Sequence, residues 1–272
     1  IYYALFSLNM DSTSGPDGFT NKFFMFYWDI VQNDVISAVR DFFIHSFMPF
    51  GMNSNFIALI PKKDNALDIN DFRPVAIGNS IPKVISKIMA IRLGNIAKDM
   101  ISTNQFGFVP ERKIHNCLFT ASECITIMRN KVQHGNMALN IDISKAFDTI
   151  KWDFIFSILK MHGFSKRFII LISSILKSAR LSIHINGSPR GFFQCTRGVR
   201  QGDPLSGLLF SLAEDYLSVF LHDLVNTGIN QRMREGRNLF APSHLFYADD
   251  ILLFGKAERK TTLCIKNIFS HY

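Results

Sequence analysis

Apolar side chains recur at helical spacing early in the chain. Between residues 19 and 47 they return every three, four or seven positions, so we predict a helix there that ends near Pro49. The apolar face of this helix consists of Phe24, Trp28, Val31, Val35 and Phe42. A helix with one such face is typical of a globular protein that buries that face in a core.

Two short extended segments come next. Phe56–Ile60 is β-compatible and is stopped by Pro61, and Phe72–Ile77 has the same character. The polar loop between them carries Lys62 and Lys63. We therefore predict a strand, a basic loop and a second strand.

Helical patterns dominate the middle of the chain. Ser80 occupies an expected N-cap position and Pro82 falls in the first turn, which predicts a helix as far as about Asp99. Further helices are predicted over residues 116–133, 152–161, 165–178 and 205–225.

Three extended regions lie among these helices. Met137–Ile143 alternates as a strand that brings Asp142 near its end, and Asn186-Gly187 favours the tight turn of a hairpin. Residues 244–254 are apolar on both sides of Asp249-Asp250, which predicts two short strands joined by a turn that carries carboxylates. This mixture predicts an α+β fold.

The composition is that of an ordinary globular protein. Apolar residues make up 47% of the 272 and charged residues 19%, with 16 Gly, 9 Pro and 4 Cys, which excludes disordered, collagen-like and disulfide-scaffold classes. The apolar run Phe168–Leu176 is half the length that a membrane span needs. The chain starts at Ile1 without a signal peptide, so we expect a piece of a longer intracellular protein.

The cysteines form neither a CxxC pair nor a metal-like pattern with histidine. They are Cys117, Cys124, Cys195 and Cys264. We therefore expect reduced thiols and no structural zinc.

The net charge of +8 is concentrated in one region. No Asp or Glu lies between Asp153 and Asp203, and the eight basic residues there equal the whole excess. They are Lys160, Lys166, Arg167, Lys177, Arg180, Arg190, Arg197 and Arg200. This basic window predicts contacts with a polyanion, and the alternative is a solvated basic face without a ligand.

Three aspartates are candidates for metal binding. Asp249 and Asp250 lie between apolar strands, where unpaired charge is costly, and Asp142 ends a different strand. A few hard oxygen ligands suit Mg²⁺, and two such ions about 3.5–4 Å apart activate a hydroxyl and steady a leaving pyrophosphate. The alternative for an isolated Asp-Asp pair is a salt-bridged turn.

Seven ordered motifs resemble a known family. Three are similar to the palm motifs of reverse transcriptases: DISKAFD at 142–148, RQGDPLS at 200–206 and YADD at 247–250. Four resemble the fingers blocks of LINE-type (non-LTR) retrotransposons: GPDGF at 15–19, LIPK at 59–62, DFRP at 71–74 and NQFGFVP at 104–110. The resemblance covers about residues 11–254, and we expect the element to come from a plant.

The resemblance implies a right-hand polymerase fold with fingers and palm but without the thumb. Residues 1–135 would be the fingers-like region with N-terminal helices and 136–272 the palm, interleaved in one domain of about 55–272 that is truncated at both ends. The implied activity is RNA-directed DNA polymerisation with Mg²⁺ or Mn²⁺. The implied partners are deoxynucleotides, an RNA template and a DNA primer, and the basic window would contact template or primer phosphates. The expected location is the nucleus, and no membrane is expected to take part.

The resemblance also implies roles for single residues. Asp142, Asp249 and Asp250 would be the catalytic and metal-binding carboxylates, with Asp142 and Asp249 bridging the metals. Phe147 would lie under the incoming sugar and exclude a ribose 2′-hydroxyl, and its alternative role is packing.

Further residues would contact the nucleotide. Lys62 and Arg73 would bind its triphosphate, with surface salt bridges as the alternative. Gln201 and Gly202 would form the loop under nucleotide and template.

The chain departs from the family pattern at three places: Glu111 replaces a usual Gly, Asn116 an Asp and Gly207 a Pro.

Two other functions stay open. One is an inactive or domesticated relic that binds nucleic acid through the basic window, and the other is a maturase-like splicing cofactor.

Overall fold

The computed structural model describes residues 1–129, 135–233 and 241–271, and its elements follow the sequence patterns closely. They form two compact units, which are described separately below. The first unit contains Ile1–Leu93 and Phe147–Phe210, and the second contains Gly94–Ala146 and Ser211–Tyr272. The predicted boundary between fingers and palm, at residue 135, is a different division and stays a prediction.

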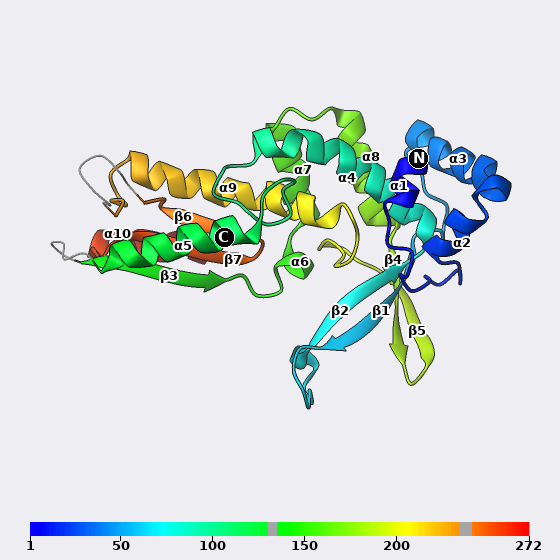
Figure 1. The fold of residues 1–272 in the computed structure, drawn as a ribbon, viewed down its shortest axis with the longest axis horizontal. Helices are drawn as coiled ribbons and strands as arrows, with labels where there is room; N and C mark the ends of the chain where they lie inside the picture. The colour runs from blue at the N-terminus through cyan, green and yellow to red at the C-terminus, as the bar shows by residue number, and fades with distance from the viewer. Residues whose placement is uncertain (130–134, 234–240, 272) are drawn as a thin grey trace. The chain divides into compact units, whose positions relative to one another are not determined.

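The first unit is built on a four-stranded sheet of order β2-β1-β4-β5 (Figure 1). Strand β1 pairs antiparallel with β2 and parallel with β4. The strands are β1 (Ser54–Pro61), β2 (Phe72–Gly78), β4 (Arg180–Ile185) and β5 (Ser188–Gln194). The Asn186-Gly187 hairpin is confirmed, because both residues have positive φ, as the tight turn requires.

Helices complete the first unit: α1 (Tyr2–Phe6), α2 (Asn21–Phe26), α3 (Trp28–His45), α7 (Trp152–Met161) and α8 (Lys166–Ser178). The single helix predicted between residues 19 and 47 is wrong in one respect, because it is interrupted at Tyr27. The Tyr27 ring packs against Phe23 and Phe26, and its backbone leaves the helical conformation. Apolar spacing continues across this break, so periodicity alone did not reveal it.

Three helices run through a boundary between the units: α4 (Ser80–Met100), α6 (Ala146–Thr149) and α9 (Ser206–Asn226). Ser80 is the first residue of α4, so its prediction as N-cap is wrong by one position.

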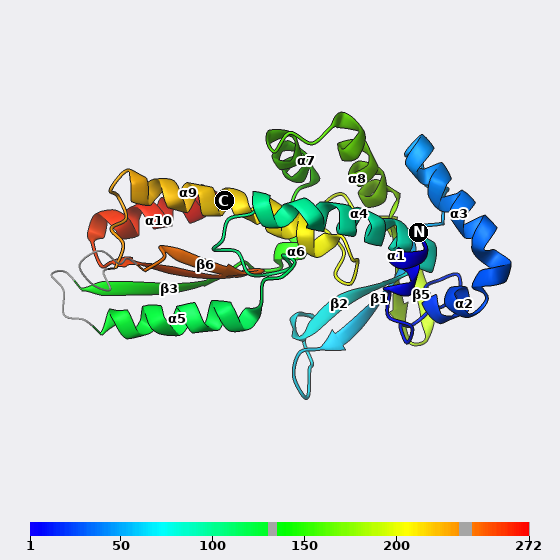
Figure 2. The ribbon, with the colours of Figure 1, turned by 45° about the horizontal axis from the view of Figure 1, so that its top comes forward.

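The second unit has three layers (Figure 2). Its antiparallel sheet has the order β3-β7-β6, with β3 (Asn136–Asp142), β6 (His244–Tyr247) and β7 (Asp250–Lys256). Helix α5 (Ile114–Met128) covers one face, and α9 and α10 (Arg259–His271) cover the other. The helix predicted over 116–133 thus starts two residues earlier and ends at Met128, and 130–133 lie outside the described residues.

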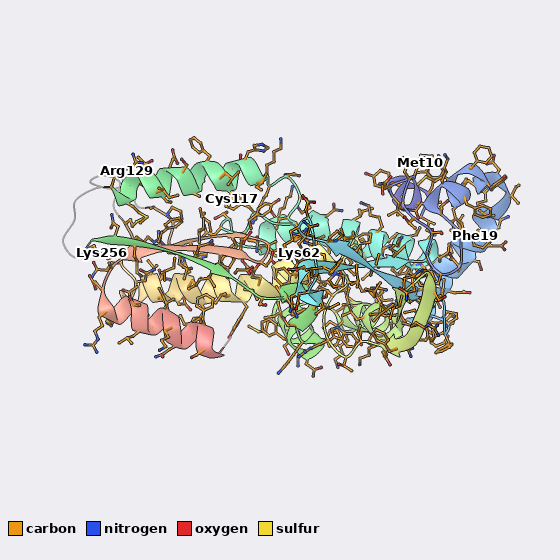
Figure 3. All side chains as sticks on the ribbon, turned by 90° about the horizontal axis from the view of Figure 1, so that it is seen from below. Met10, Phe19, Lys62, Cys117, Arg129 and Lys256 are labelled. Carbon is orange, nitrogen blue, oxygen red and sulfur yellow. The ribbon has the colours of Figure 1, made fainter. Side chains whose placement is uncertain are left out.

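The alternation of strand side chains produces these layers. Leu245 and Phe254 pack against Cys117 and Cys124 of α5, and Cys117 is labelled on this helix in Figure 3. On the other face, Phe246 packs with leucines of α9 and with α10. Successive strand residues point to opposite faces, so both faces of β6 and β7 are apolar.

All four cysteines are free. Within the described ranges, no helix has the length and apolar character needed to cross a membrane.

Candidate active site

The structure brings the three predicted aspartates to one end of the second unit's sheet. Asp142 ends β3 and lies directly opposite Asp250, the first residue of β7. Asp249 lies in the turn before β7, and its carbonyl oxygen accepts a hydrogen bond of 3.3 Å from the Ile143 amide. Residues more than 100 positions apart in sequence therefore meet through strand pairing.

The turn is tight and strained. Ala248 has φ of 55°, in a region that favours glycine, and joins β6 to Asp249. Asp250 is exposed and Asp249 is half-buried, so the pair avoids most of the cost of burying unpaired charge. The flanking strands are buried, but the turn emerges at the end of the sheet, where water reaches the carboxylates.

The donor set suits a hard cation. Asp142 and Asp250 are exposed oxygen donors that share the sheet face covered by α5, because Leu252 and Phe254 of that face follow Asp250 at spacings of two. In the described part of the chain, no three His, Cys, Asp or Glu side chains lie close enough to form a metal site by themselves. The site therefore fits Mg²⁺ in the type of its ligands, which are carboxylate oxygens, and in their placement on one face of the sheet.

Lys62 and Arg73 lie at the end of the β1-β2 hairpin in the first unit, where Figure 3 labels Lys62. Arg73 pairs with Ile60, two residues before Lys62, so the two cations are on the same side of the hairpin. Both are exposed. Lys62 Nζ donates to the Asn70 carbonyl oxygen at 2.9 Å.

A salt bridge at this hairpin involves the neighbouring lysine. Lys63 pairs with Asp71 at 2.8 Å and lowers the pKa of that carboxyl. The salt bridge thus involves Lys63, and the roles predicted for Lys62 and Arg73 stay predictions.

Gln201 and Gly202 form a loop against β2, the strand of Arg73. The Ala76 amide donates to the Gln201 carbonyl oxygen at 3.1 Å. Gly202 has φ of 98°, and a Cβ there would lie 3.3 Å from the Ala76 carbonyl oxygen. Glycine is therefore suited to this position, both by conformation and by space.

Phe147 packs within the first unit. Its ring stacks on Phe210, with centroids 4.6 Å apart and planes at 18°, and it remains half-buried. Its carbonyl oxygen accepts a hydrogen bond from the Val199 amide at 2.7 Å. The packing role is thus present, and the role as sugar gate stays a prediction.

The basic window lies on several elements of the first unit. Exposed members are Lys160, Lys166, Arg167, Lys177, Arg190 and Arg197. Arg180 is half-buried, with its guanidinium over the Phe50 ring.

Arg200 does not belong with the exposed cations. Its side chain is only 10% exposed, pairs with Asp203 at 2.8 Å and donates to Asn53 and Asn55. Its donors are thus used internally in this structure, and its contact with nucleic acid stays a prediction.

Sequence reasoning missed a buried polar pair in the second unit. Gln105 Nε2 donates to Glu214 Oε2 at 2.6 Å, and the two residues are 0% and 1% exposed. Burial, followed by the charges of Asp249 and Asp215, raises the pKa of Glu214 to about 9 although Gln105 opposes the shift. The available signal was the position of Glu214, beside Asp215, in a largely apolar helical stretch.

Comparison with known proteins gives consistent relatives. Residues 60–272 match the family described as reverse transcriptase (RNA-dependent DNA polymerase). The chain is 29% identical over 244 residues to the transposon TX1 uncharacterized 149 kDa protein of Xenopus laevis, covering 89% of this chain and 18% of that protein.

A second relative is the retrovirus-related Pol polyprotein from the type-2 retrotransposable element R2DM of Drosophila melanogaster. It is 25% identical over 251 residues, which cover 92% of this chain and 22% of that protein. The chain thus spans about a fifth of the length of these relatives.

Among solved structures, apo telomerase from Candida tropicalis, truncated from its C-terminal domain, has a TM-score of 0.54 at 14% identity, covering 95% of this chain and 54% of that one. This likeness supports the fold. By its sequence match over most of its length, the chain belongs to the reverse transcriptase family.

Proposed function

We propose that this chain is the fingers-and-palm core of a non-LTR retrotransposon reverse transcriptase, which adds deoxynucleotides to a primer 3′-end on an RNA template. The observation that carries the proposal is the meeting of Asp142, Asp249 and Asp250 at one end of a sheet, in a chain of this family. A nuclear location is the expectation for such an element.

The second unit would supply the carboxylates. Asp142 and Asp249 would hold Mg²⁺ ions and Asp250 would support them, with water and substrate phosphates as further ligands. The chemistry that such ions supply when bound is activation of the primer 3′-hydroxyl and neutralisation of charge on the leaving pyrophosphate. Mn²⁺ has the same preference for oxygen ligands.

The first unit would bind the nucleotide and the template. Arg73 presents a fork of donors and Lys62 a point charge, and both are exposed as a triphosphate site requires. Gln201 and Gly202 would support nucleotide and template from the loop against β2. The six exposed cations of the basic window would contact template or primer phosphates, with binding that weakens as salt rises.

The first test is primer extension on an RNA template with Mg²⁺, comparing the wild type with Asp249→Asn. We expect extension by the wild type and a loss of at least about 1,000-fold in the variant, with folding and template binding retained. Glu123→Gln removes an exposed carboxylate from α5 and is the matched control. Equal extension by Asp249→Asn contradicts the assignment. A folded wild type that binds RNA without extending a primer would instead identify the chain as an inactive relic of such an enzyme.

A further inference from the structure

The loop after α4 forms an isolated parallel bridge to the sheet that carries the three aspartates. The Phe246 amide donates to the Asn104 carbonyl oxygen and the Phe106 amide donates to the Phe246 carbonyl oxygen, both at 2.8 Å. Gln105 thereby pairs in parallel with Phe246 of β6, two residues before the turn. The loop and the catalytic turn are thus joined through backbone hydrogen bonds.

Gly107, which follows Phe106 in the same loop, lies directly against the turn that carries Asp249. A Cβ on Gly107 would lie 2.9 Å from Ala248 Cα and would also contact the Ala248 amide nitrogen. Both partners are backbone atoms that cannot rotate away, so only glycine allows this approach. A shift of Gly107 toward the turn would therefore push on Ala248 and on Asp249 beside it.

Three buried side chains hold the Gly107 peptide. Gln105 Oε1 accepts from the Gly107 amide at 2.8 Å, and Ser211 Oγ donates to the Gly107 carbonyl oxygen at 2.8 Å. The Gln105 amide group is in turn held by Glu214 of α9. The peptide that contacts the turn is thus fixed at both its N–H and its C=O group.

The rest of the loop is anchored independently. The Arg112 guanidinium donates to the carbonyl oxygens of Ile101 at 2.8 Å and of Gln105 at 2.6 Å. The Ser102 amide donates to Asp215 at 2.9 Å, next to Glu214 on α9. The loop therefore has a fixed path, and Gln105 is its only described side chain that bonds both Gly107 and α9.

We propose that Gln105 and Glu214 are positioning residues for catalysis, whose hydrogen bond fixes the Gly107 peptide against Ala248 and thereby sets the place of the Asp249 carboxylate. The inference rests on the proposed function, since it assigns Asp249 a reacting role. Neither residue needs to touch substrate.

The chemistry of the pair explains the choice of side chains. A buried amide can donate to one group and accept from another, which a hydrocarbon of the same shape cannot do. Burial is the main cause that raises the pKa of Glu214 to about 9, which favours its neutral form and makes glutamine a close mimic of this side chain. Glu214 Oε1 has no hydrogen-bond partner among the described residues. A glutamine at this position can therefore place its NH₂ group there and still accept from Gln105 through its carbonyl oxygen.

The test compares Gln105→Leu, Glu214→Leu and Glu214→Gln with Thr261→Val. Thr261 is buried and donates to Ile229 at 2.9 Å near the opposite end of β7, so its variant removes a buried hydrogen bond away from the turn. We expect both leucine variants to lower kcat for primer extension at least tenfold, with the KM for nucleotide within twofold of wild type. Glu214→Gln and Thr261→Val should keep kcat within threefold.

A second readout is independent of activity. Amide hydrogen exchange of the peptide covering residues 244–254 should rise at least tenfold in Gln105→Leu and stay near wild type in Glu214→Gln and Thr261→Val. If the wild type lacks extension, the proposed function fails while exchange still decides whether the pair holds the turn. The inference is overturned if exchange in Gln105→Leu matches that in Thr261→Val, or if kcat is unchanged.

Discussion

The turn that carries Asp249 and the hairpin that carries Lys62 and Arg73 are held in place in different ways. Gly107, which contacts Ala248 through backbone, is buried and bonded on both sides by Gln105 and Ser211. The hairpin end is exposed, and its bonds lie at the surface, where they contribute little stability. The turn with Asp249 is thus placed by the core, whereas Lys62 and Arg73, the proposed nucleotide ligands, keep freedom to move.

The largest contrast is expected between two glycines, one in each region. Gly107→Ala forces a Cβ into the backbone of Ala248, and we expect kcat to fall about 100-fold because the carboxylate is displaced. Gly202→Ala meets the Ala76 carbonyl oxygen at 3.3 Å, a contact that a small shift relieves, although its φ of 98° adds strain. We expect it chiefly to raise the KM for nucleotide, by less than about tenfold.

Steady-state primer extension on both variants measures this contrast, with thermal unfolding to confirm that each is folded. Equal effects on kcat would show that the two regions are equally rigid.

A substitution of Phe147, in the first unit, tests how the chain discriminates between ribonucleotides and deoxynucleotides. If its ring excludes the ribose 2′-hydroxyl, Phe147→Ala should raise ribonucleotide incorporation relative to deoxynucleotide incorporation at least tenfold. Phe147→Leu, which keeps bulk but loses the stacking on Phe210, should change this ratio much less. Competition between the two nucleotides on one template measures the ratio. A lower melting temperature with unchanged discrimination would leave Phe147 as a packing residue only.

Glu214 gives the buried region a specific pH dependence. Its pKa is raised by burial and by the charges of Asp249 and Asp215, so the folded chain holds a proton that the unfolded chain releases above its ordinary pKa of 4.5. Stability should therefore fall as pH rises from about 4.5 towards 9. Glu214→Gln removes this loss and should be more stable at pH 7 by on the order of 2 kcal/mol.

Urea unfolding at several pH values without divalent cations measures this difference between Glu214→Gln and wild type. Parallel stability profiles of the two proteins would contradict the buried neutral carboxyl.

Sequence patterns located the strands and the three candidate aspartates because both depend on local features. Asp142 follows an alternating strand, and Asn186-Gly187 marks its hairpin by conformational preference alone. The Gln105–Glu214 pair was missed because it joins residues 109 positions apart, and nothing in either local stretch names the partner. The internal use of Arg200 was missed in part for the same reason, since Asn53 and Asn55 lie far from it in sequence. Its ion-pair partner Asp203 is only three residues away, and that local signal was overlooked.

The smallest effect is expected at Glu111, where the family usually has glycine. Glu111 has φ of 69°, a conformation that costs a residue with a Cβ about 1 kcal/mol and glycine almost nothing. Its contact with Lys98, at 3.5 Å, is exposed and offsets little of that strain. Glu111→Gly should therefore stabilise the chain by about 0.5 kcal/mol after the greater entropy of unfolded glycine is included.

Chemical unfolding of Glu111→Gly beside Glu111→Ala separates charge from conformation, because alanine removes the carboxylate and keeps the strain. We expect stabilisation by glycine alone. This loop segment precedes α5 and follows Gly107. A gain in stability with glycine alone would show that the chain tolerates backbone strain close to the residues proposed to position Asp249. Equal stability of the two variants would instead attribute the effect to the charge.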